Sequence, residues 1–179
     1  MADVTIDEFT SYIENRKDAS GLNLSGLNLS NMQMQNLKLR GANFTGCDLS
    51  KSDLSGSDLT RANLRGANLD QAILRNAIFI RANLTITDMR GADLRCANFE
   101  GANLSGAASN SGQSTARVIG ANMHKVNAQN ANFLNSILVR VNFNSSNLYG
   151  ANFEGANITR VSLQGAKYYI DAFDRAIGV

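Results

Sequence analysis

Large apolar residues recur at every fifth position through most of the chain. The first series runs without a gap from Leu24 to Leu104 and contains only Leu, Met and Phe. A five-residue step advances about 500° around an α-helix, so such residues would leave any single helical face. On a straight strand, an odd step would place them on alternating faces. The chain must therefore turn within each unit, and the pattern predicts a solenoid.

The other positions of the unit fit an extended segment followed by a corner. A small residue stands two positions before each large one, as Ala42 does before Phe44, and residues two apart on an extended segment point the same way. The residue between them is usually Asn or Asp and should point outward. The unit often ends in Gly, which tolerates the backbone angles of a tight turn. Each unit should thus place one small and one large side chain in a narrow core.

The units read GANFT, RANLR, GANLD, RANLT, GADLR and GANLS, and in this respect the chain resembles the pentapeptide repeat family. The resemblance implies an all-β solenoid, namely a right-handed quadrilateral β-helix with four pentapeptides in each coil. Roughly 28 units over residues 21–169 would make about seven coils, and a spacing of about 4.8 Å per coil gives a rod about 34 Å long. One ladder of core residues would then be Leu24, Phe44, Leu64, Leu84 and Leu104.

Residues 1–20 are predicted to form a capping helix and a linker. Thr5 and Glu8 have the spacing of a capping box, in which each side chain bonds the backbone N–H of the other residue. One face of the helix should carry Ile6, Phe9 and Ile13. The first coil should be wide enough to receive that face, because its usually small positions hold Leu22, Leu27, Met32 and Leu37. Such a plug would cover backbone groups that invite polymerisation at a bare end.

Residues 170–179 are predicted to form a short helical cap at the other end, because Ile170, Phe173 and Ile177 have helical spacing. An alternative stays open, since in some pentapeptide repeat proteins an apolar terminus pairs with a second copy. The sequence therefore allows either a monomer or a dimer that forms through the C-terminal end.

The repeat is interrupted once. After Leu104 and Ala107 the sequence reads SNSGQST, which has no large apolar residue, and the period then resumes one position out of frame from Val118. We expect a loop insertion of about four extra residues near residues 108–116, on one corner of otherwise continuous coils. A functional loop and a tolerated insertion both fit its small, polar composition.

The sequence contains no recognisable catalytic or metal-binding constellation. Its one histidine, His124, has an outward repeat position. Cys47, Cys96 and His124 would have to converge from different coils to bind a metal ion. The glycine-containing units lack the Walker lysine pattern of a phosphate-binding loop. We therefore expect a protein that is not an enzyme and has no cofactor or metal.

The two cysteines and the start of the chain bear on the compartment. Cys47 should point inward and Cys96 outward, more than two coils apart, which argues against a mutual disulfide and fits a reducing compartment. No charged and then apolar leader opens the chain, and no apolar run approaches the length of a membrane span. We expect a cytoplasmic protein that does not associate with a membrane.

Charge bears on a role described for some pentapeptide repeat proteins, which protect DNA gyrase from quinolones by resembling duplex DNA. The formal net charge of the chain is +2, but the repeat body carries fourteen Lys and Arg against eight Asp and Glu, so the rod itself is about +6. A DNA mimic needs a negative face. Nucleic-acid binding is disfavoured as well, because only Tyr149 is an aromatic residue at a clearly outward repeat position.

Arginines recur at the coil period and should stack in pairs. The three pairs are Arg61 with Arg81, Arg75 with Arg95, and Arg140 with Arg160. Unrelieved, such pairs would repel each other. They are either sites for a bound anion or spread, solvated guanidinium groups.

Apolar residues break the outward polar pattern at two places. Ile73 and Ile78 occupy the position normally given to Asn or Asp, and Ile80 lies just beyond Phe79. An apolar centre with an arginine rim is typical of a protein contact, and the rim here would be Arg61, Arg75, Arg81 and Arg95. Ile137 and Val139 repeat the anomaly, on the same side as Ile73 if the loop closes suitably. The alternative is scattered surface isoleucines that favour extended structure.

Taken together, these features predict a non-catalytic, rigid scaffold for protein interaction or regulation, with a protein partner that the sequence does not identify. The alternative is a DNA mimic that binds or protects DNA gyrase or another topoisomerase, as in quinolone resistance. A continuous negative face would favour the mimic, whereas apolar patches beside a basic field would favour the scaffold.

Overall fold

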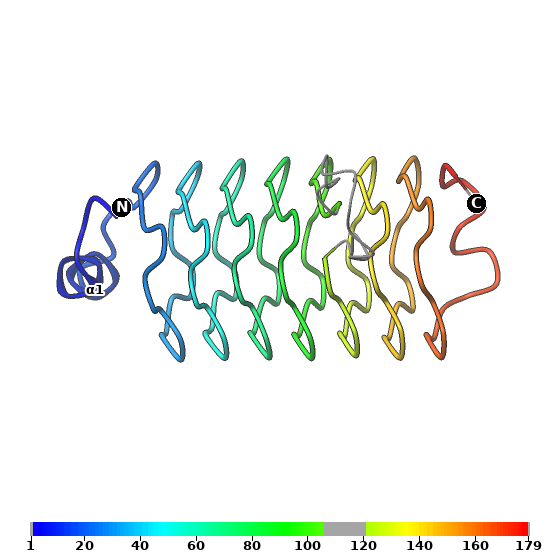
Figure 1. The fold of residues 1–179 in the computed structure, drawn as a ribbon, viewed down its shortest axis with the longest axis horizontal. Helices are drawn as coiled ribbons and strands as arrows, with labels where there is room; N and C mark the ends of the chain where they lie inside the picture. Colours follow the sequence, from blue (N-terminus) through cyan, green and yellow to red (C-terminus); the bar gives the residue numbers. More distant parts are fainter. Residues whose placement is uncertain (1, 106–120, 179) are drawn as a thin grey trace, which may run out of the picture.

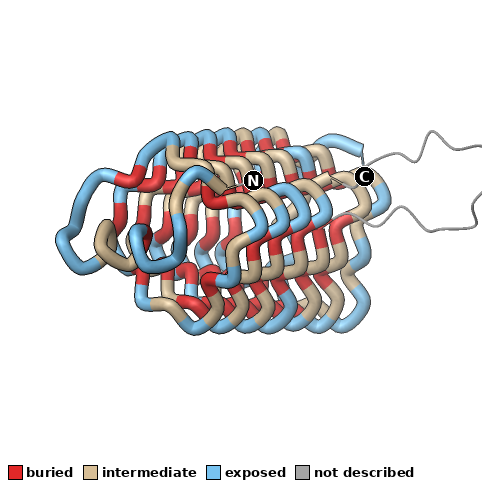
Figure 2. Tube along the Cα trace, turned by 60° about the vertical axis from the view of Figure 1, so that its left-hand side comes forward, coloured by how far each residue is buried: buried red, intermediate tan, exposed pale blue. Residues whose placement is uncertain are grey.

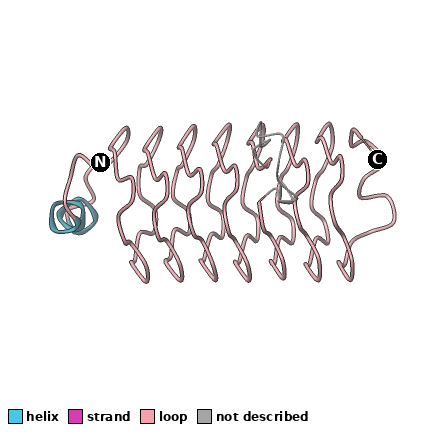
Figure 3. Ribbon diagram, in the orientation of Figure 1, coloured by secondary structure: helices cyan, strands magenta, loops and turns pink. Residues whose placement is uncertain are grey.

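The computed structural model describes residues 2–105 and 121–178 of the chain, and they form a rod of stacked coils (Figure 1). Helix α1, Ile6–Glu14, lies across the N-terminal end of the rod, and the C-terminus lies at the other end. In the described residues α1 is the single helix, and the coils contain turns and isolated bridge residues in place of longer strands (Figure 3).

The rod has four sides, because four ladders of parallel bridges join residues that are 20 apart, or 34 apart across the interruption. Side 1 runs from Asn23 to Ile177, side 2 from Asn28 to Ser162, side 3 from Gln33 to Lys167, and side 4 from Lys38 to Asn152. Each coil contributes one bridge residue to each side. The backbone N–H and carbonyl of this residue bond the coil before it, and the backbone groups of its two sequence neighbours bond the coil after it. This arrangement agrees with the four-sided β-helix that the family resemblance implies.

The corners explain the last position of the repeat. Every fifth residue from Gly21 to Gly101, and again from Lys125 to Gly165, has a positive φ. This left-handed conformation suits Gly and Asn and is costly for a β-branched residue. Ile86 nevertheless adopts it, with a φ of 54°.

The outward Asn and Asp residues hold these corners in place. The Oδ1 atom of Asn43 accepts a hydrogen bond of 3.1 Å from the backbone N–H of Thr45, and Asp48 accepts one of 3.0 Å from Ser50. Amide groups also bond along a side, as Asn43 Nδ2 does to Asn23 Oδ1 at 3.0 Å. Asn and Asp serve equally at this position because either offers the oxygen that the turn needs.

Along most of the rod, buried positions alternate with less buried ones in each coil (Figure 2). The buried side chains form a narrow core in which large residues are flanked by small ones. Phe79, Phe99, Phe133 and Phe153 form a parallel stack with successive ring centroids 4.8, 5.1 and 5.0 Å apart. Phe173 continues the column as a ring tilted by 42°, with its centroid 4.7 Å from that of Phe153. Beside it lies a fully buried ladder of Leu24, Phe44, Leu64, Leu84 and Leu104. Each ring therefore packs on the ring of the next coil, which favours one fixed stacking distance along the rod.

The coils continue in register across the interruption. Asp88 pairs with Asn122, 34 residues later and not 20, so 14 residues are additional at this point. Ala121 N–H bonds the carbonyl of Leu104 at 2.9 Å. The expected insertion of about four residues is therefore wrong, because a five-residue period reveals an insertion only to within a multiple of five. The segment 108–116, where the loop was expected, lies outside the described residues.

Helix α1 begins at a complete capping box. Glu8 N–H donates to Thr5 Oγ1 at 3.2 Å, and Thr5 N–H donates to Glu8 Oε2 at 2.7 Å. Phe9 is fully buried against the first coil, and Tyr12 and Ile13 pack beside it. Ile6, which was expected on the same face, is 42% exposed. The second half of α1 occupies the contact, so the first turn is left in solvent.

The short helix expected at residues 170–179 is not formed, since residues 170–175 are turns. Phe173 stacks on Phe153, and Ile177 pairs with Asn157, so the chain keeps the 20-residue register to its end. Ile170 is 99% exposed. Ring stacking and backbone pairing to the preceding coil thus prevail over the helical spacing of the apolar residues, because they bury Phe173 on a core that already exists.

Candidate protein-binding surface

The apolar residues singled out around residues 73–81 lie on two adjoining sides of one coil. Ile73 lies on side 3 and is 37% exposed. Ile78 lies on side 4 and is half-buried, and Ile80 lies at the corner between side 4 and side 1. Because Ile73 and Ile78 have no side-chain oxygen, they cannot make the corner hydrogen bond that Asn or Asp makes elsewhere. The chain gives up a stabilising bond at these positions, which makes them candidates for function.

On side 3 the predicted arginine pair is neutralised. Arg75 Nε lies 2.6 Å from Asp93 Oδ2, and Arg95 Nη2 lies 2.7 Å from the same oxygen. Partial burial opposes ionisation of this carboxyl, but the hydrogen bonds from Arg95 and Arg75 lower the pKa of Asp93 from 3.8 to about 2. The two guanidinium groups therefore hold an internal carboxylate and offer no open anion site.

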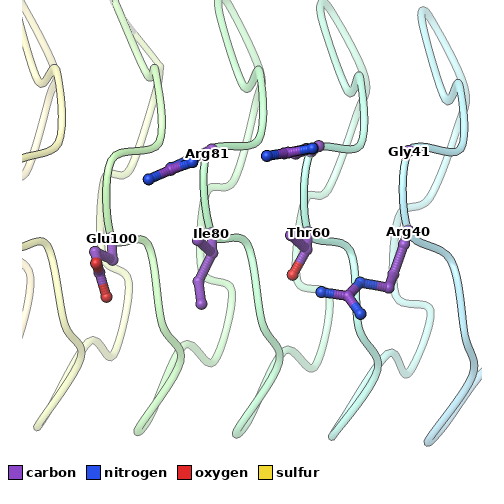
Figure 4. A pocket seen from close by; sticks show the side chains of 7 residues that line it. Arg40, Gly41, Thr60, Ile80, Arg81 and Glu100 are labelled. Atoms are coloured by element: carbon purple, nitrogen blue, oxygen red, sulfur yellow. The ribbon is translucent and has the colours of Figure 1, made fainter.

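The corner between side 4 and side 1 differs, because it forms an open cleft of about 450 Å³, called here the arginine cleft (Figure 4). Its lining consists of Arg40, Gly41, Thr60, Arg61, Ile80, Arg81 and Glu100. Consecutive coils bring these residues together, since Arg61 N–H bonds the carbonyl of Ile80 and Arg81 N–H bonds that of Glu100, both at 2.9 Å.

The charged groups of the arginine cleft are largely unpaired. Arg40 reaches Asp58 at 3.3 Å. The side chains of Arg61, Arg81 and Glu100 make no hydrogen bond or ion pair with other residues in the described parts of the chain. Two stacked arginines and one carboxylate thus border the apolar side chain of Ile80 with their charges unsatisfied by the protein.

A second cleft, of about 510 Å³, lies toward the C-terminal end of side 4 and was missed from the sequence. Tyr169, Asp171 and Asp174 line it together with Glu154 and Arg175, which lie 3.3 Å apart. The signal was present in the sequence, because Glu154 and Asp174 are spaced by one coil. Treating residues 170–179 as a helix removed them from the register.

The second apolar cluster does not join the first. Ile137 is 42% exposed and pairs with Asn103 and Asn157, which places it on side 1, opposite Ile73 on side 3. Val139 is half-buried at the following corner. Ile86, exposed at another corner of the rod, was not singled out in the sequence, although its turn position is normally filled by Gly or Asn.

The C-terminal end is also apolar and open. Tyr169 and Ile177 are exposed, as are Tyr168 and Ile170, and the rings of Tyr149 and Tyr169 lie 5.1 Å apart. Among the described residues, none beyond Gly178 pairs with the backbone of this last coil. Such an end is able to pair with a second surface.

The two cysteines have different environments. Burial raises the pKa of the Cys47 thiol to about 11, whereas Cys96 is exposed. In the described parts of the chain, no three His, Cys, Asp or Glu side chains are grouped so that they could hold a metal ion. Within the same residues, no helix has the length and apolar character to cross a membrane.

The sequence model of the family described as Pentapeptide repeats matches the chain in eight copies, over residues 23–61, 57–95, 79–107 and 136–167. No curated protein is significantly similar to the chain in sequence. The matched residues are those that build the coils.

Solved structures with the same repeat are similar to the chain over much of its length. A pentapeptide repeat protein from the thylakoid lumen of Arabidopsis thaliana is 32% identical over 67% of this chain and 70% of its own, with a TM-score of 0.42. QnrB1, a plasmid-mediated fluoroquinolone resistance protein, is 20% identical over 83% and 89%, with a TM-score of 0.46. HetL, involved in the regulation of heterocyst differentiation in the cyanobacterium Nostoc, is 21% identical over 98% and 97%, with a TM-score of 0.34.

Proposed function

Because the chain belongs to the pentapeptide repeat family, whose members are right-handed four-sided β-helices, we propose that it is a non-catalytic scaffold that binds a protein partner through its outer surface. In the described coils, stacked rings and leucines fill the core and leave no interior site for a ligand. A partner must therefore bind to the outer surface of the rod. Backbone hydrogen bonds between the coils hold the outer surface in one conformation, which lowers the entropy cost of binding.

The contact surface that we propose consists of Ile78, Ile80, Arg61 and Arg81. The observation that supports it is the arginine cleft, where an apolar side chain lies beside two arginines without an acidic partner in the described residues. Protein interfaces favour Arg and apolar residues at their centre. At the stacked pair beside side 3, by contrast, Arg75 and Arg95 already share the carboxylate of Asp93.

Substitution at the proposed contact surface tests this proposal. Ile78→Asp and Ile80→Asp should leave the melting temperature within a few degrees of the wild type and should abolish capture of the partner from a lysate of the source organism. Ile137→Asp is the matched control, because it places the same charge on an exposed isoleucine of side 1. Loss of capture by the control alone would place the contact surface elsewhere, and a collapse of stability in Ile80→Asp would mean that this side chain belongs to the core.

DNA mimicry, the alternative that the sequence left open, is not favoured. Asp53 and Asp93 lie on side 3 but are separated by Ile73, and Asp93 is already bound by two arginines. On side 2, Asp88 is bound by Arg90 at 2.8 Å. The acids therefore do not form the continuous negative face that would compete for a basic DNA channel. Inhibition of gyrase supercoiling by the purified protein, or protection of gyrase from a quinolone, would revive this alternative.

The exposed C-terminal end supports pairing of two copies, in the manner that the sequence left open. Tyr168, Tyr169 and Ile170 are exposed side by side at a coil whose backbone has no following partner. Light scattering on the purified protein should give the mass of a dimer, and Ile170→Asp should give that of a monomer. A wild-type monomer at concentrations of about 100 μM would exclude this pairing as a stable state.

A further inference from the structure

The protein contains its own example of how two stacked arginines bind a carboxylate. Asp93 accepts hydrogen bonds from Arg75 at 2.6 Å and from Arg95 at 2.9 Å and 2.7 Å. Arg61 and Arg81 are stacked at the same 20-residue spacing, yet the described residues bring no carboxylate to them. One coil further on, Glu100 is a carboxylate without a cationic partner among those residues.

We propose that the arginine cleft binds an extended segment of the partner protein in which an acidic residue and a basic residue are two positions apart. The acidic side chain lies between Arg61 and Arg81, and the basic side chain lies against Glu100. This inference rests on the proposed scaffold function and names the chemistry of its ligand.

The spacing of the coils sets the spacing of the ligand. Neighbouring coils are about 4.8 Å apart. Along the rod, the midpoint between the backbones of Arg61 and Arg81 therefore lies one and a half coil spacings, or about 7 Å, from the backbone of Glu100. Side chains two positions apart on an extended peptide project from one face at about 6.6 Å. An acid and a base at that spacing therefore reach both sites at once, whereas adjacent residues project to opposite faces.

Ile80 and the backbone beside it complete the site. Ile80 lies in the same cleft as both charge sites and offers an apolar floor to the stems of the two bound side chains (Figure 4). Its backbone N–H lacks the usual Asn or Asp acceptor, because position 78 is Ile. A carbonyl oxygen of an extended peptide can accept the hydrogen bond of this N–H in its place.

The charge pattern favours a peptide over a nucleic acid. Glu100 in the same cleft repels a polyanion, and Ile80 offers no stacking surface for a base. A free phosphate ion would satisfy the arginines but leave Glu100 unpaired. A segment with both signs of charge is the occupant that satisfies every charged group of the cleft.

The test uses two fluorescein-labelled peptides of one composition. In the first, Glu and Lys are separated by one Thr within a run of Thr residues, and in the second Glu and Lys are adjacent. Fluorescence polarisation with the full-length protein at low salt should show at least about tenfold tighter binding of the first peptide, since only it can make both charge-assisted contacts together. Equal binding of the two peptides would overturn the proposal.

Variants of the full-length protein assign the binding to the cleft. The double variant Arg61→Gln, Arg81→Gln should weaken binding of the first peptide at least about tenfold. Arg65→Gln, an exposed arginine outside the cleft, should leave it unchanged, and circular dichroism should show all variants folded. Glu100→Lys should instead prefer a peptide with Glu at both charged positions, and absence of this switch would contradict the assigned orientation.

Other ligand classes have their own outcomes in the same assay. Inorganic phosphate alone that displaces the first peptide at equal affinity would make the cleft a simple anion site and overturn the proposal, as would tighter binding of oligothymidine than of peptide. If the peptides fail but Ile80→Asp still abolishes partner capture, the scaffold function stands and only the inferred ligand is wrong.

Discussion

Ser136 carries a buried hydroxyl without a partner, and its removal should stabilise the protein. The side chain is 1% exposed, and its Oγ makes no hydrogen bond. It occupies the small inward position of its repeat, between coils that hold Ala102 and Ala156 at the equivalent place. Ala therefore fits the space, and Ser136→Ala removes only an unsatisfied polar atom.

The magnitude follows from the cost of burying a hydroxyl without a hydrogen bond, about 1–3 kcal/mol. We expect Ser136→Ala to raise the free energy of unfolding by about 1 kcal/mol, which corresponds to about 3 °C in melting temperature for a chain of this size. Differential scanning calorimetry or urea unfolding at neutral pH measures this difference.

Ser146 provides the matched control, because it is equally buried at the same repeat position but is hydrogen-bonded. Its hydroxyl donates to the carbonyl of Met123 at 2.7 Å and accepts from Val126 N–H at 3.2 Å. Ser146→Ala should therefore lower the free energy of unfolding by about 1 kcal/mol. The reasoning is refuted if both substitutions change the stability in the same direction.

Three further predictions concern the core, a corner and an ion pair. Leu64→Asp should abolish cooperative unfolding and near-native circular dichroism, because it places an unpaired charge in a fully buried column; a folded variant would mean that the rungs are not a closed core. Ile86→Asn should raise the free energy of unfolding by about 1 kcal/mol, because Asn tolerates the positive φ of 54° at this corner better than Ile does. The opposite change at an equivalent corner, Asn76→Ile, should lower the free energy of unfolding. If neither variant changes the melting temperature, the corner at Ile86 is not strained. The pKa of Asp93 is about 2 in the folded protein and 3.8 as a free side chain, so its contribution to the free energy of unfolding is present above pH 4 and is lost as the pH falls toward 2. Asp93→Asn should therefore flatten the dependence of the free energy of unfolding on pH in that range, as measured by urea unfolding. An unaltered pH dependence would show that the pairing with the arginines adds nothing to stability.

Much of the architecture could be predicted because it depends on one short period. A five-residue recurrence of large apolar side chains is incompatible with a straight helix or strand. The chain must therefore coil around a common axis, with the large side chains from Leu24 to Leu104 pointing toward that axis. The N-terminal start of α1 is equally local, since Thr5 and Glu8 are three residues apart and need no other part of the chain to form their two bonds.

The features that could not be predicted depend on residues that meet 20 or more positions apart. A period of five gives the length of the interruption only to within a multiple of five, and the pairing of Asp88 with Asn122 was needed to show 14 additional residues. That register also decides that Ile137 lies opposite Ile73. At the C-terminus the spacing of Ile170 and Ile177 fits a helix, but Phe173 packs on a ring already in place.

The candidate site shows the same division. The sequence by itself identifies Ile78 and Ile80 as breaks in the outward polar pattern, and Arg61 and Arg81 as a pair that recurs at the coil period. Whether an arginine is neutralised depends on whether a carboxylate from its own or a neighbouring coil lies within reach of its side chain. Asp93 lies within 2.7 Å of both Arg75 and Arg95. Arg61 and Arg81 have no carboxylate at such a distance among the described residues. Local periodicity determines which residues face outward, and stacking of distant segments determines which of their charges remain available for a partner.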